Sequence, residues 1–201
     1  MVECSSRHGP LDQYKVVSQS EANRDEQNAE VLLTDCRFRG QIIVRGNTDV
    51  PEFADAIERV VGLRPPVEST TAVGGTGFPR LLWLGPDEWL VLTEDALREK
   101  TLDQLTEKLV GQHFQVVDVS DARAVIGLTG PRARNVLEKG CPLDLHSRVF
   151  GAGRSTRTIV ARVQIILHQV TEVPDYDIYV QRSLAEYLWA WLEDARHEYE
   201  I

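Results

Sequence analysis

Cysteine is scarce in this sequence of 201 residues, which contains only Cys4, Cys36 and Cys141. The three lie far apart and form no C-x-x-C pair, so neither a disulfide framework nor a zinc site is expected. A chain of this length with 42% hydrophobic residues can bury a core without cross-links. The low cysteine content therefore favours a reducing, cytoplasmic location.

Long apolar runs and an excess of positive charge are also lacking. No uncharged hydrophobic segment approaches membrane-spanning length, and the N-terminus has no basic-then-apolar signal pattern. Lysine and arginine number 22 against 31 acidic residues, which gives a net charge of −9. Nucleic-acid binders usually carry a basic surface. We therefore expect neither a membrane nor a nucleic acid as a partner.

The motifs of common enzyme sites are missing as well. The sequence contains no G-x-S-x-G, P-loop, G-x-G-x-x-G or H-E-x-x-H motif. The glycine cluster at 74–77 precedes an expected strand and lacks a following Gly-Lys-Ser/Thr, which favours a plain loop. The histidines are scattered, and His168 lies in an apolar strand, which is typical of a buried or interface histidine. The sequence thus indicates no catalytic residue, no cofactor-binding residue and no metal ligand.

From residue 31 onward, segments with strand and helix periodicity alternate. The expected strands are 41–44, a hairpin over 80–93, 115–119, 122–128, a β-rich run over 156–170 that forms one bent strand or a pair, and 176–181. The expected helices follow Asp49, Thr101, Gly130 and Ser183. Asp49, Thr101 and Ser183 are the expected N-caps, each with Glu or Gln three residues later. In the last helix, the expected core-facing residues are Leu184, Leu188, Trp191, Leu192 and Ala195.

Two halves of the chain repeat this order of elements. The segment GPDEWLVL before one helix matches VPDYDIYV before another. We predict an α+β fold of two pseudo-repeated ferredoxin-like layers, each an antiparallel sheet with helices packed on one face. The halves are expected at about 31–119 and 120–201 within one domain, 31–201. Residues 1–30 are expected to form a polar tail, either frayed or ordered against a partner through residues 14–17.

The junction of the halves, 118–145, contains several residues that end or begin strands and helices. Gly130-Pro131 ends a strand and begins a helix, Gly140 is expected to supply a left-handed cap, and Pro142 prevents continuation. Asp118 and Asp121 flank the strand junction, where a turn cap is favoured over acid–base chemistry. The segment thus predicts a sharp change of chain direction and no active site.

One stretch departs from the acidic character of the chain. No acidic residue lies between Asp144 and Glu172, whereas four arginines do. The stretch can be a solvated basic loop, an anion site or a docking patch for an acidic partner. The candidate subunit-docking residues are Arg148, Arg154, Arg157 and Arg162.

Three segments carry a family resemblance: RLLWLGPDEWLVL, VVDVSDARAVIGLTGPRARNVLEKGCPLDLH and YDIYVQRSLAEYLWAWLEDA. Over about residues 35 to 196 the chain resembles the gamma subunit of bacterial heterotetrameric sarcosine oxidase. The resemblance implies the aminomethyltransferase-like, folate-binding fold group and a sarcosine oxidase gamma-type domain. It also implies a non-catalytic structural subunit of a flavoenzyme that demethylates sarcosine to glycine, hydrogen peroxide and formaldehyde, or methylenetetrahydrofolate when tetrahydrofolate is present.

The same resemblance implies the partners and cofactors. The expected partners are alpha, beta and delta subunits, and the holoenzyme is expected to carry FAD, FMN, NAD and zinc and to use tetrahydrofolate. None of these groups is expected on this chain. The alternative is a stand-alone folate-dependent aminomethyltransferase, but TEVPDYDIYV lacks the glycines that those enzymes place beside folate. An adaptor for another flavoenzyme is a third possibility.

Overall fold

The structure is a computed structural model that describes residues 8–12, 14 and 29–199. Its strands are β1 (Leu32–Asp35), β2 (Arg39–Arg45), β3 (Ala72–Val73), β4 (Arg80–Gly85), β5 (Glu88–Glu94), β6 (Gln115–Asp118), β7 (Arg123–Thr129), β8 (Arg154–Val160), β9 (Val163–Gln169) and β10 (Asp175–Gln181). Its α-helices are α1 (Pro51–Val61), α2 (Arg98–Leu109), α3 (Ala133–Glu138) and α4 (Ala185–Arg196). Short 3-10 helices, η2 (Asp95–Leu97), η3 (Arg182–Leu184) and η4 (His197–Tyr199), flank α2 and α4.

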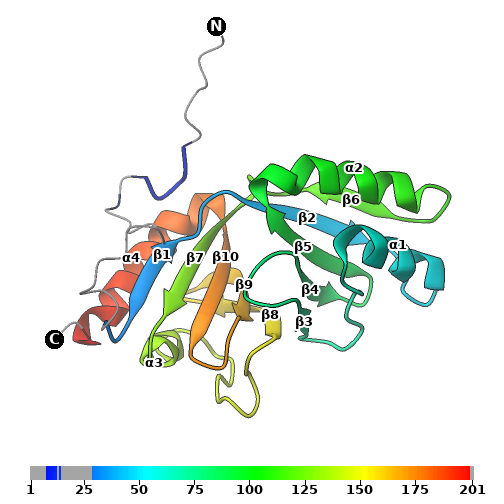
Figure 1. Ribbon diagram of the computed structural model, residues 1–201. Coiled ribbons are helices and arrows are strands. Elements are labelled where there is room, and N and C mark those ends of the chain that lie inside the picture. The colour runs from blue at the N-terminus through cyan, green and yellow to red at the C-terminus, as the bar shows by residue number, and fades with distance from the viewer. Residues whose placement is uncertain (1–7, 13, 15–28, 200–201) are drawn as a thin grey trace, which may run out of the picture.

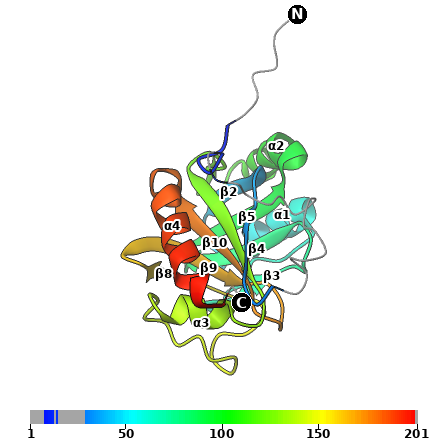
Figure 2. The ribbon, with the colours of Figure 1, turned by 90° about the vertical axis from the view of Figure 1, so that its left-hand side faces the viewer.

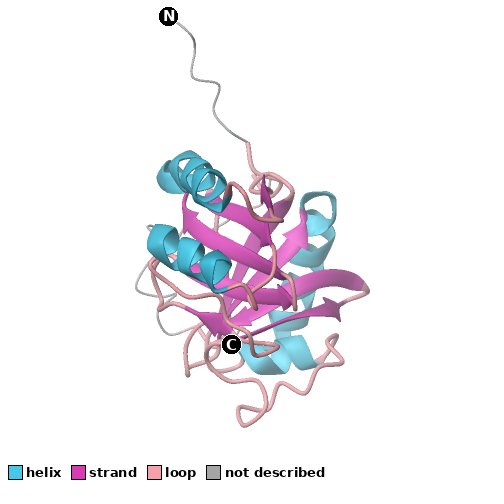
Figure 3. Cartoon of the chain, turned by 90° about the vertical axis from the view of Figure 1, so that its right-hand side faces the viewer, coloured by secondary structure: helices cyan, strands magenta, loops and turns pink. Residues whose placement is uncertain are grey.

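The strands form two five-stranded sheets in which every neighbouring pair is antiparallel (Figure 1). The first sheet has the order β3-β4-β5-β2-β6, and the second has the order β1-β7-β10-β9-β8. Helices α3 and α4 cover the outer face of the second sheet (Figure 2), and α1 and α2 cover that of the first (Figure 3). The predicted α+β fold of two ferredoxin-like layers is confirmed.

The pseudo-repeat is visible in the strand order, but one strand crosses the expected boundary. Read from edge to edge, the order β6-β2-β5-β4-β3 of the first sheet corresponds position by position to the order β1-β7-β10-β9-β8 of the second. The strand after α2, β6, therefore closes the first sheet, whereas β1, at the start of the expected first half, closes the second. The expected division at 119/120 does not hold for 32–35, because Leu33 is buried in the core of the second sheet. A strand of only four residues does not itself specify which sheet it joins.

Each central strand contributes to two cores because successive side chains point to opposite faces. In β2, Ile42 and Val44 pack with α1 and α2, whereas Ile43 faces the second sheet. In the first sheet, Trp89 is fully buried against α1, and its Nε1 donates to the Pro66 carbonyl at 2.8 Å. The core between the sheets contains Cys36, Ile43, Leu82, Leu84, Leu90, Leu92, Val125, Ile166 and Tyr179.

The ends of the helices follow the sequence only in part. Pro51 begins α1 and Gly62, with φ of 78°, ends it as predicted, but the three expected capping boxes are wrong. The N-caps of α1, α2 and α4 are Val50, Leu97 and Leu184, and none makes a side-chain cap hydrogen bond. Turns of 3-10 helix precede α2 and α4, so each α-helix begins at a position other than the expected cap.

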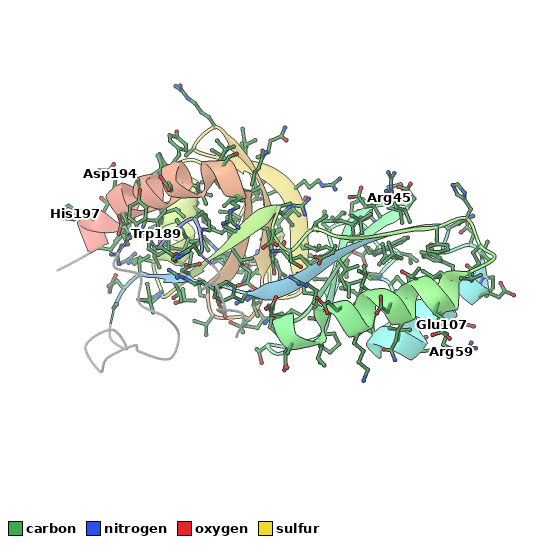
Figure 4. All side chains as sticks on the ribbon, turned by 90° about the horizontal axis from the view of Figure 1, so that it is seen from above. Arg45, Arg59, Glu107, Trp189, Asp194 and His197 are labelled. Atoms are coloured by element: carbon green, nitrogen blue, oxygen red, sulfur yellow. The ribbon has the colours of Figure 1, made fainter. Side chains whose placement is uncertain are left out.

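Three of the five residues expected on the core-facing side of α4, Leu188, Leu192 and Ala195, are buried as predicted. Trp189, absent from the expected core set, is 2% exposed, whereas Leu184 is 38% exposed (Figure 4 labels Trp189 beneath the helix). Trp191 is only partly buried and packs near Gly140. Gly140 is not a left-handed cap: it has no positive φ, and a Cβ there would lie 2.6 Å from the Trp191 ring. The absence of a side chain at 140 therefore makes room for the Trp191 ring.

The N-terminal residues that the structure describes are packed against the domain. Leu11 is fully buried in the core of the second sheet, and the Tyr14 ring lies 6.1 Å from that of Trp189. The Arg182 guanidinium donates to the His8 carbonyl at 2.8 Å. The expectation of a tail is therefore wrong for 8–12 and 14; Lys15, Val16 and Val17 lie outside the described residues.

The open question about 156–170 is resolved as a pair of strands. β8 and β9 are joined by Ala161 and Arg162, whose φ values are 49° and 73°. Positive φ at both central residues is typical of the two-residue hairpin turn that matches strand twist. Arg162 thus lies at the tip of a hairpin.

Candidate functional site at the interface between the two sheets

A buried group of charges joins the two sheets. Asp177 of β10 accepts hydrogen bonds from Arg39 Nη1 of β2 at 2.6 Å and from Arg80 Nη1 of β4 at 2.7 Å. The side chains of Asp177, Arg39 and Arg80 are only 5%, 11% and 5% exposed. Because the carboxylate belongs to one sheet and both guanidinium groups to the other, we call these three residues the inter-sheet charge cluster.

The charge state of the cluster follows from its surroundings. Burial by itself would raise the pKa of Asp177, but Arg39 and Arg80 outweigh that effect and hold the pKa below its ordinary value. His168 lies directly opposite Asp177 on β9, and burial lowers its pKa to about 4. Asp177 is therefore ionised and His168 neutral near pH 7, which is a structural arrangement rather than a proton-transfer pair.

The glycine-rich segment 74–77, which was expected to be a loop, contacts Arg80 of the inter-sheet charge cluster. Arg80 Nε donates to the Gly77 carbonyl at 2.9 Å, and Arg80 Nη2 donates to the Thr76 carbonyl. A Cβ at Gly74, whose φ is 112°, would lie 2.7 Å from the Pro79 carbonyl oxygen. The loop therefore fits closely around an arginine, and two of its carbonyl groups are engaged with the Arg80 guanidinium.

A cavity of about 620 Å³ opens beside the cluster. Its wall includes Phe78, whose ring lies 5.6 Å from the Arg39 guanidinium and 5.3 Å from that of Arg80. Cys36 also lines it, but burial raises the pKa of its thiol to about 12, so the reactive thiolate is not populated near neutral pH. Burial likewise raises the pKa of Asp175, and the neighbouring Asp177 adds to the effect. The lining contains no activated nucleophile.

The junction at Asp118 is a turn, as predicted. Asp118 Oδ1 accepts hydrogen bonds from the Ser120 backbone N–H at 2.9 Å and from the Ser120 hydroxyl at 2.6 Å. Asp118 Oδ2 lies 3.2 Å from Arg98 Nε. The carboxylate is thus engaged in holding the chain between β6 and β7.

The four arginines expected to dock a partner fall into two groups. On β8, Arg154 Nη1 contacts Glu68 Oε1 at 3.0 Å, and Arg157 Nη2 contacts Glu88 Oε1 at 2.7 Å. Arg148 and Arg162 are exposed in a loop and in the β8–β9 turn. The structure therefore gives Arg154 and Arg157 partners within the chain, and the docking role of the four stays a prediction.

Sequence reasoning did not identify the inter-sheet charge cluster. Arg39 and Arg80 are 138 and 97 residues away from Asp177 in the chain. The available signal was a charged residue in each of three strands, at the first position of β2 and of β4 and at the third position of β10. In the described ranges 8–12, 14 and 29–199, no three His, Cys, Asp or Glu side chains gather as metal ligands, and no helix is long and apolar enough to cross a membrane.

The arrangement of the layers defines the class of protein. The fold is shared with the glycine cleavage system aminomethyltransferase T from Bartonella henselae, with a TM-score of 0.63 and 14% identity over 82% of this chain and 46% of that one. The structure of heterotetrameric sarcosine oxidase from Corynebacterium sp. U-96, in complex with pyrrole 2-carboxylate, matches over 97% of both chains, with a TM-score of 0.83 and 29% identity.

Sequence similarity then specifies the family. The protein-family model described as "Sarcosine oxidase, gamma subunit family" matches residues 45–198 of this chain. Sarcosine oxidase subunit gamma of Corynebacterium sp. (strain P-1) is 34% identical over 169 residues, which are 84% of this chain and 81% of that protein. The chain belongs to the sarcosine oxidase gamma subunit family, as the resemblance predicted.

Proposed function

We propose that this chain is a structural subunit of a heterotetrameric sarcosine oxidase and contributes no catalytic group to it. The observation that carries the proposal is the match over 97% of both chains, at a TM-score of 0.83, to a chain of heterotetrameric sarcosine oxidase. The interior supports it as well, because Asp177, Arg39 and Arg80 are engaged with one another and His168 is neutral near pH 7. These charged groups hold the two sheets together.

The partners in this proposal are the alpha, beta and delta subunits, in the cytoplasm. The assembly would oxidise sarcosine to glycine, with hydrogen peroxide and formaldehyde, or methylenetetrahydrofolate when tetrahydrofolate is present. FAD, FMN, NAD and zinc would be held by the other subunits. The close fit of the 74–77 loop around Arg80 and the protonated thiol of Cys36 support the assignment of these cofactors to the other subunits.

Native mass spectrometry of the chain purified from its own cells tests the proposal. We expect a flavin-containing complex with three other chains that oxidises sarcosine, and no flavin on this chain once the subunits are separated. Recovery of the chain only as a free monomer would contradict the proposal.

The alternative of a stand-alone folate-dependent transferase is tested by titrating the purified chain with a reduced folate. The chain spans 46% of the aminomethyltransferase structure that shares its fold. We expect no saturable binding to the isolated chain. Binding at micromolar concentration would favour the transferase.

A further inference from the structure

The inner face of the second sheet is covered only in part by the first sheet. A cavity of about 580 Å³ lies over the uncovered part, where β7, β8, β9 and β10 contribute its walls. Arg123 and Gln181 are register partners on β7 and β10, and Ile159 and Gln164 are register partners on β8 and β9. Ile159 is 43% exposed. The cavity thus combines two arginines, Arg123 and Arg157, with two amides and an exposed apolar side chain.

Arg123 differs from Arg39 and Arg80 in having no counter-charge among the described residues. Within the part of the chain that the structure describes, its guanidinium makes no ion pair, and its buried Nη1 has no hydrogen-bond partner. The nearby Glu88 is engaged by Arg157 at 2.7 Å. Arg39 and Arg80, by contrast, share the carboxylate of Asp177.

The electrostatic surroundings of Arg123 are therefore unbalanced. Burial lowers the pKa of Arg123, the charge of Arg157 lowers it further, and Glu88 opposes them only partly. Burying a guanidinium without a carboxylate costs free energy, and an anion that enters the site offsets part of that cost. In a chain with 31 acidic residues, none of the described ones pairs with this guanidinium.

We propose that a carboxylate side chain of a partner subunit enters this cavity and pairs with Arg123. The inference rests on the proposed function, because it requires a partner subunit. Arginine is enriched in protein interfaces, and the exposed Ile159 beside it offers apolar area that a partner can cover, which favours a protein carboxylate over a free acid. The positive cavity in a chain of net charge −9 also directs an acidic partner to one place.

Competition for incorporation into the holoenzyme tests this proposal. Wild-type chain and the Arg123→Glu variant are co-expressed at equal levels with the other subunits, and their ratio in the purified complex is measured by mass spectrometry. We expect the variant at roughly one-thirtieth of the wild-type level or below, because losing one member of a buried charge pair weakens binding by at least that factor. Arg59→Glu, which makes the same charge change on the exposed side of α1 (Figure 4), should be incorporated equally.

Thermal unfolding of the isolated full chain separates docking from a structural role. Because Arg123 has no carboxylate partner within the described chain, Arg123→Gln should leave the unfolding midpoint unchanged or raise it. A midpoint lowered by several degrees would assign Arg123 to the fold and overturn the proposal. Sodium acetate serves as the probe for a free carboxylate: a midpoint raised by acetate in wild type but not in Arg123→Gln, with equal incorporation of both, would also overturn it.

The outcomes distinguish this proposal from the proposed function. If wild-type chain enters a four-chain complex and Arg123→Glu enters it equally well, only the docking proposal fails. If wild-type chain itself enters no complex, the subunit function fails and the docking proposal fails with it.

Discussion

Replacing Asp177 by asparagine tests whether the inter-sheet charge cluster holds the two halves together. The substitution keeps the shape of the side chain but removes the negative charge that Arg39 and Arg80 contact at 2.6 and 2.7 Å. Both guanidinium groups stay largely buried, at 11% and 5% side-chain exposure. The variant therefore contains two buried cations with no carboxylate between them.

The expected loss of stability is large for a single substitution. Breaking a buried ion pair by removing one partner costs about 3–5 kcal/mol, because an uncompensated charge remains inside. A domain with a free energy of unfolding of about 5–15 kcal/mol would lose a substantial part of it. For a chain of this length, the loss lowers the unfolding midpoint by roughly 6–20 °C.

Asp87→Asn is the matched control. Asp87 pairs with Arg45 at 2.8 Å, but its side chain is 55% exposed and that of Arg45 is 46% exposed. Exposed pairs contribute about 0–1 kcal/mol, so this variant should unfold close to wild type. The two substitutions make the same chemical change at nearly the same distance and differ in burial.

Urea unfolding of the full chain, followed by both tryptophan fluorescence and circular dichroism, measures the difference. Coincident transitions by the two probes justify a single free energy of unfolding. If Asp177→Asn loses no more stability than Asp87→Asn, burial does not make the cluster important and the reasoning is wrong. Unequal denaturant slopes would instead show that the variant no longer unfolds as one unit.

Two further predictions use the same unfolding assay, and a third uses native mass spectrometry. First, burial lowers the folded-state pKa of His168 to about 4, and Asp177, Arg80 and Arg39 face the imidazole. As the pH falls below 6.5, the unfolded chain therefore binds a proton before the folded chain does, and the stability that neutral His168 contributes is lost between pH 6.5 and 4. Wild type should therefore lose about 2 kcal/mol more than His168→Gln between pH 7 and pH 5, and equal losses would refute the assignment. Second, Gly46→Ala would place a Cβ 2.1 Å from the buried Phe53 ring and should cost about 1–3 kcal/mol, whereas Gly75→Ala meets no atom within 4 Å and should cost much less; equal costs would contradict the packing argument. Third, Arg154→Glu with Arg157→Glu should weaken assembly in native mass spectrometry while the isolated chain stays folded, since their pairs with Glu68 and Glu88 are partly exposed; unchanged assembly would remove these two arginines from the docking surface.

Features that depend on neighbours in the chain were predictable from the sequence. Pro51 and Gly62 bound a helix because the fixed φ of proline and the left-handed freedom of glycine act locally. The hairpin turn at Pro86 and Asp87 and the Asp118 turn follow from the same kind of short-range chemistry. Side-chain periodicity then specified two layers of sheet and helix, and the family resemblance followed from the same segments.

Other features depend on contacts that the sequence does not display. The placement of β1 in the second sheet, the burial of Leu11 and the choice of Trp189 over Trp191 were decided by which surfaces meet. The same is true of Asp177, whose partners lie 97 and 138 residues away and come together only through the packing of one sheet on the other. A charged residue in an apolar strand is recognisable by itself, but its partner is specified by register and layer geometry. The sequence thus determined the layers and the family. The tertiary structure decided which charges are paired, as at Asp177, and which lie without a counter-charge among the described residues, as at Arg123.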